Sequence, residues 1–457
     1  MIARRRIPVG LGLVLLAYLV LAFLYAIRIP AWNAPDEPAH YNFIRSIAVD
    51  HRLPILEPGD YDQARLSRLV SQHFPVGESI AGLKYESHQP PLYYLIASPV
   101  FLATQGLGVR RQVVALRLVT VLIGALFVVA TYRLASLIFP KATPYPLAAA
   151  AFVAFIPMHV FMDAAIDNDA LAELMVCLTL IVLVEDLARP RSPRHDWLAG
   201  VLVGLSILTK LVAGITAILV VVGFLGSALL SANREKNLRE WPVRVLRSGV
   251  VAVLISGWWF IRNVVIYGIG DPVGLRRHAL VVVGQPLTPT LSPFTMRQMS
   301  LTAFHSFWGQ FGWMGIPYAN RTYDVLATLS VFVGLGVFVF VWRMLRSARQ
   351  PEETLDEKGP TLTFSRPQRW SLVLLAFAIV CVVVGVVFYN MRYLQPQGRY
   401  LFPTLPGLAV FSVAGIGELI REEHIRLVLT LTVLAMVWLC IFSLFQVIGP
   451  AFAVASP

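Results

Sequence analysis

The chain has 457 residues, of which 57% are hydrophobic and only 14% are charged. A water-soluble protein would carry roughly a quarter charged residues, so an ordinary soluble enzyme is excluded. The formal net charge is +12, but the excess Lys and Arg lie in short loops between apolar runs, where they set the orientation of a membrane protein. This distribution also excludes a nucleic-acid partner as the meaning of the charge.

Apolar runs follow one another along the chain, each near the length of about 20 residues that crosses a bilayer as a helix. We predict an all-α polytopic membrane protein with about eleven transmembrane helices and with interfacial helices in its first long loop. The first run follows three arginines, but it is too long for a signal peptide and no small-residue cleavage site follows, so we expect it to be retained. The predicted spans are 9–27, 114–138, 144–162, 167–186, 197–213, 215–231, 248–267, 323–342, 370–389, 400–420 and 425–447.

One further apolar segment, 90–106, is not a regular span, because Pro90, Pro91 and Pro99 interrupt the backbone hydrogen bonds of a helix. Its placement follows from charge. If it does not cross, the N-terminal arginines and the basic loops after the fourth, sixth and eighth spans share the cytoplasmic side. If it crosses, every later loop changes sides, and the loops rich in Lys and Arg then lie outside, against the positive-inside rule. We therefore expect an interfacial or half-inserted element at the outer face, with the N-terminus in the cytoplasm.

Two segments between spans are long, and both are predicted on the outer side. They are 30–112, which we call the first long loop, and 268–322, the second long loop. The inner loops are short, and 343–369 is expected to be only a charged cytoplasmic connector. We therefore predict a single integral membrane domain over 1–457, with any chemistry at the outer membrane surface beneath the two long loops.

Two adjacent carboxylates follow the first span in the stretch "APDEPAHY". Asp36 and Glu37 lie between two prolines, which stiffen the turn and end the helix. His40 follows Asp36 by four residues, so a helical turn would place both on one face. Such an Asp and His pair suits a general base or a metal site. The alternative is a helix terminus whose acids are solvated by headgroup water.

A second group of acids, in "MDAAIDNDA", interrupts the apolar pattern at the outer end of the third span. Acids at membrane depth are candidates for function, so Asp163 and Asp167 join the candidate site. The alternative is a hydrated hairpin between two spans, and we expect Asp169 only to cap the next helix.

Three cations are predicted at the outer ends of spans, where the positive-inside rule makes them less expected. They are Lys210 in "GLSILTK", Arg262 in "WWFIRNVVIYG" and Arg399 in "QPQGRYLFPTLP". Together they could hold the phosphate of a lipid. The alternative is that each side chain extends along the membrane surface and keeps its charge in water.

Several motifs occur in one order along most of the chain: "PDEPAH", "YESHQPPLYYLIASP", "GLSILTK", "WFIRNVVIYGIGDP" and "GRYLFPTLP". This ordered set resembles the GT-C glycosyltransferase superfamily, close to bacterial relatives of the protein O-mannosyltransferases and of the lipid A aminoarabinose transferase. The resemblance implies a sugar donor built on a polyprenyl phosphate and a reaction at the outer face.

The resemblance also implies roles for individual residues. Asp36 matches the catalytic aspartate, Glu37 its usual neighbour, and Arg399 a cation near the donor phosphate. His88 falls just before the "PPLYY" element, which is a juxtamembrane segment in relatives. The large C-terminal soluble domain of oligosaccharyltransferases has no counterpart here, which favours the transfer of a single sugar. The position of His40 holds other residues in some relatives.

The expected reaction is an inverting transfer to an acceptor hydroxyl, with Asp36 as the base. The expected partners are the lipid-linked sugar, membrane lipids, and an acceptor that is a glycan, a lipid or a protein. The sequence identifies no certain cofactor. A divalent metal ion held by Asp36, His40 and Asp163, or with Asp167, is the alternative that stays open. The alternative function is a transporter or lipid flippase that uses Asp163 and Asp167 as ion sites. A lipid-linked polymer ligase or polymerase would share the same outer site.

Overall fold

The computed structural model describes residues 8–75, 77–139, 144–189, 192–289, 292–347 and 364–453. Regular structure in these ranges is helical, apart from one short antiparallel ribbon in which Phe311 faces Ile316. The prediction of an all-α polytopic fold is confirmed. The α-helices are α1 (Val9–Arg28), α2 (Glu37–Ala48), α3 (Gln63–Ser71), α4 (Leu92–Thr104), α5 (Val109–Ile138), α6 (Pro144–Ala154), α7 (Pro157–Asp163), α8 (Asp169–Ala188), α9 (Pro193–Thr209), α10 (Ile215–Leu230), α11 (Arg234–Tyr267), α12 (Leu275–Val281), α13 (Pro293–Trp308), α14 (Asn320–Ser347), α15 (Arg366–Asn390), α16 (Leu405–Leu419), α17 (Glu422–Phe442) and α18 (Gly449–Ala453). The shorter elements are η1 (Tyr85–His88), η2 (Gln105–Leu107), η3 (Leu211–Gly214), β1 (Gln310–Phe311), β2 (Ile316–Pro317), η5 (Gly398–Thr404) and η6 (Ser443–Ile448).

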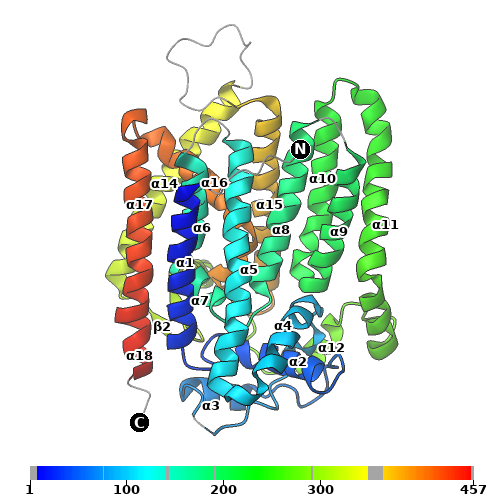
Figure 1. The fold of residues 1–457 in the computed structure, drawn as a ribbon, viewed down its shortest axis with the longest axis vertical. Helices are drawn as coiled ribbons and strands as arrows, with labels where there is room; N and C mark the ends of the chain where they lie inside the picture. Colours follow the sequence, from blue (N-terminus) through cyan, green and yellow to red (C-terminus); the bar gives the residue numbers. More distant parts are fainter. Residues whose placement is uncertain are drawn as a thin grey trace.

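The long helices run side by side in one bundle (Figure 1). Within the described residues, eight helices have the length and apolar composition to cross a membrane, or nine if the bent pair α6 and α7 forms one span. α8 and α9 lie alongside them, but α8 carries four carboxylates and α9 has only 17 residues. The predicted number of about eleven spans therefore stays a prediction.

The predicted span 144–162 is not one straight helix. α6 and α7 meet at a bend of 63°. Pro157 begins α7, and a proline supplies no backbone N–H and disfavours helical geometry in the residue before it. The helix therefore stops before Ile156, which is extended, and starts again in a new direction. This bend carries Asp163 and the following loop toward the first long loop.

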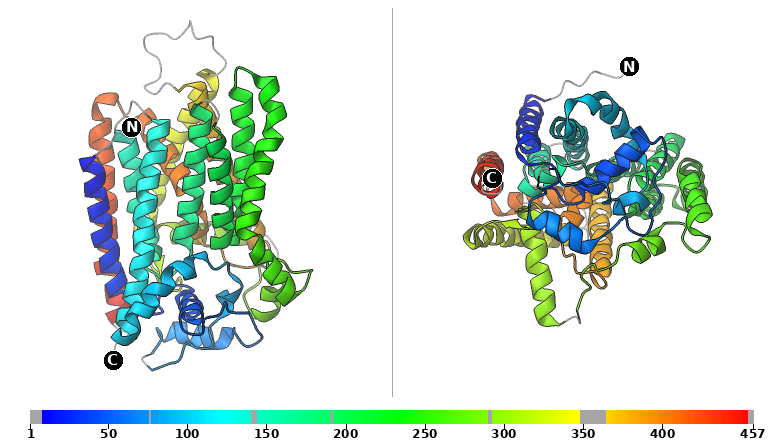
Figure 2. Two further views of the ribbon diagram at one scale, coloured as in Figure 1. Left: turned by 45° about the vertical axis from the view of Figure 1, so that its right-hand side comes forward. Right: turned by 90° about the horizontal axis from the view of Figure 1, so that it is seen from below.

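Helices α2, α3, α4 and α12 lie together at one end of the bundle, and the start of α1 lies at the other end (Figures 1 and 2). α4 covers most of the segment 90–106 and has 13 residues, which is too short for a span. It packs against α2, where the rings of Phe43 and Tyr94 stack 3.7 Å apart. The first long loop therefore contains short helices, as expected, and their position at the membrane interface stays a prediction.

Candidate functional site

A left-handed backbone conformation holds Asp36 at the start of α2. Its φ is 65°, and it is the N-cap residue of the helix. A residue other than glycine rarely adopts this conformation unless its surroundings enforce it. Pro35 and Pro38 restrict the backbone on both sides, and the Asp36 carbonyl accepts hydrogen bonds from the amides of Ala39 and His40. The carboxylate consequently has a fixed direction.

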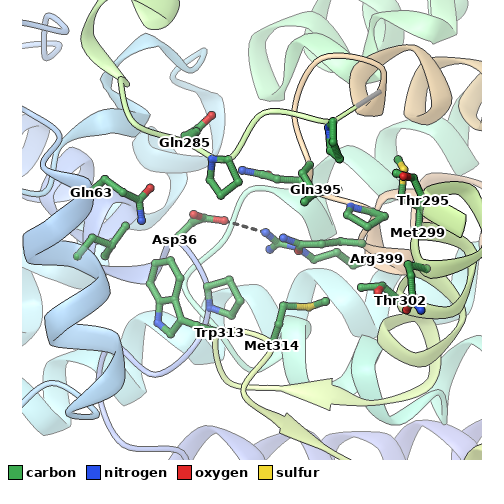
Figure 3. Close-up of a pocket in the computed structure, with 18 of the residues that line it drawn as sticks. Asp36, Gln63, Gln285, Thr295, Met299, Thr302, Trp313, Met314, Gln395 and Arg399 are labelled. Atoms are coloured by element: carbon green, nitrogen blue, oxygen red, sulfur yellow. Dashed lines mark hydrogen bonds and ion pairs between the residues drawn. The ribbon is translucent and has the colours of Figure 1, made fainter. Parts of the chain in front are cut away.

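The Asp36 carboxylate binds the cation Arg399 (Figure 3) and also a hydroxyl. Its Oδ2 accepts a hydrogen bond from Nη2 of Arg399 at 2.8 Å, and its Oδ1 accepts one from the Tyr85 hydroxyl at 3.1 Å. Burial raises the pKa of Asp36, but the charge and the hydrogen bond of Arg399 and other nearby charges together place the pKa below its usual value. The side chain is 26% exposed. An ionised carboxylate is therefore accessible from outside.

Arg399 is placed by a close approach between η5 and α13. Gly398 lies so near to α13 that a Cβ atom would collide with the helix backbone, and its amide donates to Ser306 Oγ at 2.8 Å. The Arg399 guanidinium donates to Gln397 Oε1 at 2.6 Å and lies 3.6 Å from Asp167 Oδ2. The cation is thus held between two carboxylates.

Asp36 and Arg399 line a cavity of about 580 Å³, a size typical of small-molecule sites. The first long loop, the second long loop and the segment before Arg399 enclose it (Figure 3). The polar lining is otherwise uncharged and includes five glutamines, two threonines and two tyrosines. The described lining residues are Pro35, Asp36, Tyr61, Gln63, Leu66, Tyr85, Gln285, Pro286, Pro289, Phe294, Thr295, Gln298, Met299, Thr302, Trp313, Met314, Leu394, Gln395, Pro396, Gln397 and Arg399.

Comparison with known proteins supports the sequence resemblance over part of the chain. Residues 88–260 match the family model described as dolichyl-phosphate-mannose-protein mannosyltransferase. This match covers less than half of the chain and does not include Asp36. A comparison of the sequence with curated proteins finds no match.

Solved structures extend the likeness to nearly the whole chain. ArnT from Cupriavidus metallidurans matches with a TM-score of 0.52 in the apo state, at 15% identity over 89% of this chain and 60% of ArnT. The same protein bound to undecaprenyl phosphate matches with a TM-score of 0.51, at 15% identity over 98% of this chain and 75% of that chain. The chain has the fold of GT-C membrane glycosyltransferases. An Archaeoglobus fulgidus oligosaccharyltransferase, in complex with Zn and sulfate, matches with a TM-score of 0.50 at 16% identity. The match covers 94% of this chain but only about half, 53%, of that protein.

Within this GT-C fold, Glu37 faces away from the cavity that Asp36 lines. Its carboxylate forms a two-point ion pair with Arg117 of α5, with both distances 2.7 Å. It also accepts the backbone amides of Trp32 and Ile166, at 2.8 and 3.3 Å. Arg117 in turn donates to three carbonyls at the end of α1. Glu37 and Arg117 are fully buried, so the pair joins the first long loop to the bundle.

His40 and Asp167 lie behind Asp36 rather than in the cavity. The His40 Nδ1 is 2.8 Å from the Tyr94 hydroxyl, and its Nε2 is 3.7 Å from Asp167 Oδ1. Burial lowers the pKa of His40, so its ring is neutral at pH 7. The buried Oδ2 of Asp167 accepts no hydrogen bond from the described residues and faces Arg399. These two residues form the rear wall of the site.

The predicted cations do not all converge. Lys210 forms an ion pair with Asp169. Asp169 is the first residue of α8 and not its cap as expected, because Asn168 holds the N-cap position. Arg262 donates to the carbonyl of Pro54 at 2.6 Å and lies over the Trp259 ring. It does not line the cavity. Of the three cations, Arg399 is the one that contacts Asp36.

Asp163 belongs to a different cluster inside the bundle. It accepts a hydrogen bond from Tyr18 of α1 at 2.6 Å and lies 3.5 Å from His159, which also binds Glu173 of α8. Asp36, His40 and Asp163 therefore have separate partners. The described residues contain no group of three or more His, Cys, Asp or Glu side chains that could hold a metal ion. As they are placed, these residues do not fit the metal site considered from the sequence.

His88 lies at the end of η1 and contacts the second long loop. Its Nδ1 is 3.0 Å from the Tyr85 carbonyl, and its ring lies 4.4 Å from that of His278 in α12. Sequence reasoning missed Tyr85 and also Arg117, whose partners are 49 and 80 residues away. Tyr85 belongs to the quoted "YESH" motif, so that motif could have identified it. Arg117 gave one signal, a charge inside an apolar run.

Proposed function

We propose that the protein transfers a single sugar from a polyprenyl-phosphate donor to an acceptor hydroxyl at the outer membrane face. The contact between Asp36 and Arg399, in the cavity that both long loops line, is the observation that carries this proposal. The matched family description names a dolichyl-phosphate sugar, and the similar ArnT structure holds undecaprenyl phosphate. The distribution of basic loops supports an outer location.

The proposed reaction assigns one role to each charge. An Asp36 oxygen takes the proton from the acceptor hydroxyl. At the same time the oxygen of this hydroxyl attacks the anomeric carbon of the donor sugar. The bond between this carbon and the phosphate oxygen breaks, the configuration inverts, and the polyprenyl phosphate leaves. Arg399 stabilises the negative charge that develops on the leaving phosphate. The donor phosphate would accept part of the hydrogen bonding that Arg399 now donates to Asp36.

Residues behind the cavity would set the position of these two groups. The buried pair of Glu37 and Arg117 fixes the backbone next to Asp36. His40 and Asp167 occupy the space behind the carboxylate and the guanidinium. Lys210 is paired with Asp169 and adds positive charge behind the site. We assign these residues to positioning and to the local field, whereas Asp36 and Arg399 touch the reacting groups.

The decisive experiment measures transfer in proteoliposomes that contain the full chain and a radiolabelled polyprenyl-phosphate sugar. Asp36→Asn should reduce transfer by about 10²–10⁴-fold, the usual contribution of a positioned base. Asp50→Asn, an exposed acid of the same loop, is the matched control and should retain full activity. Free polyprenyl phosphate must appear together with the glycosylated acceptor. Wild-type transfer by Asp36→Asn would refute the assignment of the base.

The same vesicles separate the rival functions. A transporter or flippase would move the labelled molecule across the bilayer without releasing the lipid phosphate. A polymerase or ligase would yield products that carry many sugars. A product with one added sugar, formed in amounts equal to the released lipid phosphate, supports the proposal.

A further inference from the structure

A second cavity, of about 700 Å³, lies between the first turns of α9 and α11. Because α9 runs from this cavity to Lys210 beside the candidate site, about 25 Å separate the two along the helix. The first turns of α9 and α11, which line the cavity, therefore lie at the opposite end of the bundle from α2 (Figure 1), where Asp36 is the N-cap. The lining residues are Ser192, Pro193, Asp196, Glu235, Lys236, Arg239, Glu240, Val243, Arg244 and Arg247.

The floor of this cavity is a neutralised and rigid network. Arg244 donates to both oxygens of Asp186, at 2.8 and 3.0 Å, and to Asp196 at 2.7 Å. His195 lies 3.0 Å from the same Asp186 carboxylate. Arg244 and both aspartates are buried. This floor needs no ligand, because each buried charge already has a partner.

The rim carries accessible charges of both signs. Lys236 and Glu240 are 3.9 Å apart and exposed, so their attraction is weak. Arg239 and Glu235 form no ion pair with the described residues, and both are exposed. Arg247 is half-exposed and lies 3.6 Å from Asp196. Cations and carboxylates thus stand side by side around one opening.

The surrounding side chains place this rim at the level of lipid headgroups. α11 has 34 residues and is about 50 Å long, which exceeds the hydrocarbon thickness of about 30 Å. Just beyond the rim, Val243 and Leu246 are 46% and 65% exposed. Trp197 beside the cavity is 55% exposed, and tryptophan prefers the membrane interface. A molecule in the cavity would therefore have apolar helix surface directly next to it.

We propose that this cavity binds the headgroup of a membrane phospholipid that carries both a phosphate and a primary ammonium, as phosphatidylethanolamine does. Arg239, Lys236 and Arg247 suit the phosphate, and the exposed Glu235 accepts a hydrogen bond from the ammonium. The acyl chains would lie on the exposed apolar surface of α11. A headgroup with phosphate alone leaves Glu235 without a donor, and a quaternary ammonium has no N–H to donate.

Native mass spectrometry of the full chain in detergent tests this inference with three lipids of identical acyl chains. The headgroups are phosphatidylethanolamine, phosphatidylglycerol and phosphatidylcholine. The first bound phosphatidylethanolamine should have a Kd about tenfold lower than that of either other lipid, a difference of about 1.4 kcal/mol. Equal affinity for phosphatidylglycerol or phosphatidylcholine would overturn the proposal.

Two variants and a solute complete the test. Glu235→Gln should shift the preference toward phosphatidylglycerol, and the double variant Glu235→Gln with Arg239→Gln should abolish any preference. The exposed pair Arg68→Gln with Glu78→Gln, in the first long loop, is the matched control and should bind like the wild type. Glycerophosphoethanolamine should not displace the lipid at equal concentration, since it lacks acyl chains. A double variant that keeps the preference, or displacement by this solute, would refute lipid binding at this cavity.

Discussion

Adjacent carboxylates after the first span have opposite surroundings. Asp36 keeps a quarter of its side chain exposed and faces the cavity, whereas Glu37 is fully buried and has hydrogen bonds from Arg117 and two backbone amides. From the sequence, both belonged to one catalytic group. The structure separates a carboxylate that can meet a substrate from one that supports the fold, because the two side chains leave α2 in different directions.

Glu37→Gln should destabilise the protein far more than Asp36→Asn does. Removing one partner of a buried ion pair leaves the other charge without compensation and costs about 3–5 kcal/mol. Arg117 would be that charge, since it is only 1% exposed. The midpoint of thermal inactivation should fall for Glu37→Gln and stay unchanged for Glu78→Gln, an exposed acid. A Glu37→Gln protein with normal stability and no transfer would instead assign Glu37 to catalysis.

Arg399→Gln should move the acid limb of the pH–rate profile to higher pH. In the wild type, burial raises the pKa of Asp36, but the charge and the hydrogen bond of Arg399, together with other nearby charges, hold it below its usual value. Without that charge, burial raises the pKa of Asp36, so the base becomes protonated at a higher pH and activity is lost there as the pH falls. Arg399→Lys keeps a charge and should restore most of the wild-type profile. An unchanged acid limb in Arg399→Gln would show that Asp36 is not the titrating base.

At the scale of helices, hydropathy predicted helices where the structure has them, because lipid contact demands apolar side chains over about 20 residues. It failed where other forces act. α11 begins 14 residues before the predicted span at 248, since its charged first turns extend beyond the bilayer. The bend between α6 and α7 follows from Pro157, which the sequence contains but the apolar pattern does not reveal.

The two long loops contact each other through a pair of histidines. His88 of η1 lies 4.4 Å from His278 of α12. Burial lowers the pKa of His88 to about 4 and that of His278 to about 3. Lys210 and His40 lower the pKa of His88 further, and His88 lowers that of His278. Both rings are consequently neutral at pH 7, and the contact requires this neutral form.

Docking of α12 should weaken as the pH falls. The undocked histidines keep a pKa near 6.5, so the undocked form binds more protons between about pH 6.5 and about pH 4. Docking is therefore fully stable above about pH 6.5. Protonation of His88 alone removes about 3 kcal/mol of the docking free energy by pH 4. Amide hydrogen exchange of α12, corrected for intrinsic rates, should increase from pH 7 to pH 5. His278→Gln should reduce this dependence, and His424→Gln, an exposed histidine of α17, should not.

At the scale of the whole molecule, the cavity joins parts that are far apart in the sequence. Asp36 and Arg399 are separated by 363 positions, and the second long loop supplies much of the remaining wall. The sequence predicted that both loops would cover the chemistry, because charge placed them on one side. It could not predict the wall itself, since residues such as Gln285 and Gln298 carry no signal without their spatial neighbours.

The composition of this wall predicts the kind of sugar that the protein accepts. Asp36 and Arg399 are the charged residues among the described lining, and they pair with each other. A sugar with an ammonium or a carboxylate would bury a charge that has no partner, which costs far more than burying a hydroxyl. Neutral sugars on the same polyprenyl phosphate should therefore be transferred at least about tenfold faster than amino sugars or uronic acids.

The uncharged amides should act on this preference through substrate affinity. Each amide that loses its hydrogen bond to a sugar hydroxyl costs about 0.5–1.5 kcal/mol, so Gln298→Leu should raise the KM for a neutral donor by about 2–10-fold. Its kcat should change little, because Gln298 is not among the contacts of Asp36 or Arg399. Gln105→Leu, at an exposed glutamine outside the cavity, provides the control.

Faster transfer of an amino sugar by the wild type would contradict the neutral wall, because such a sugar needs a free carboxylate and Asp36 is already bound to Arg399.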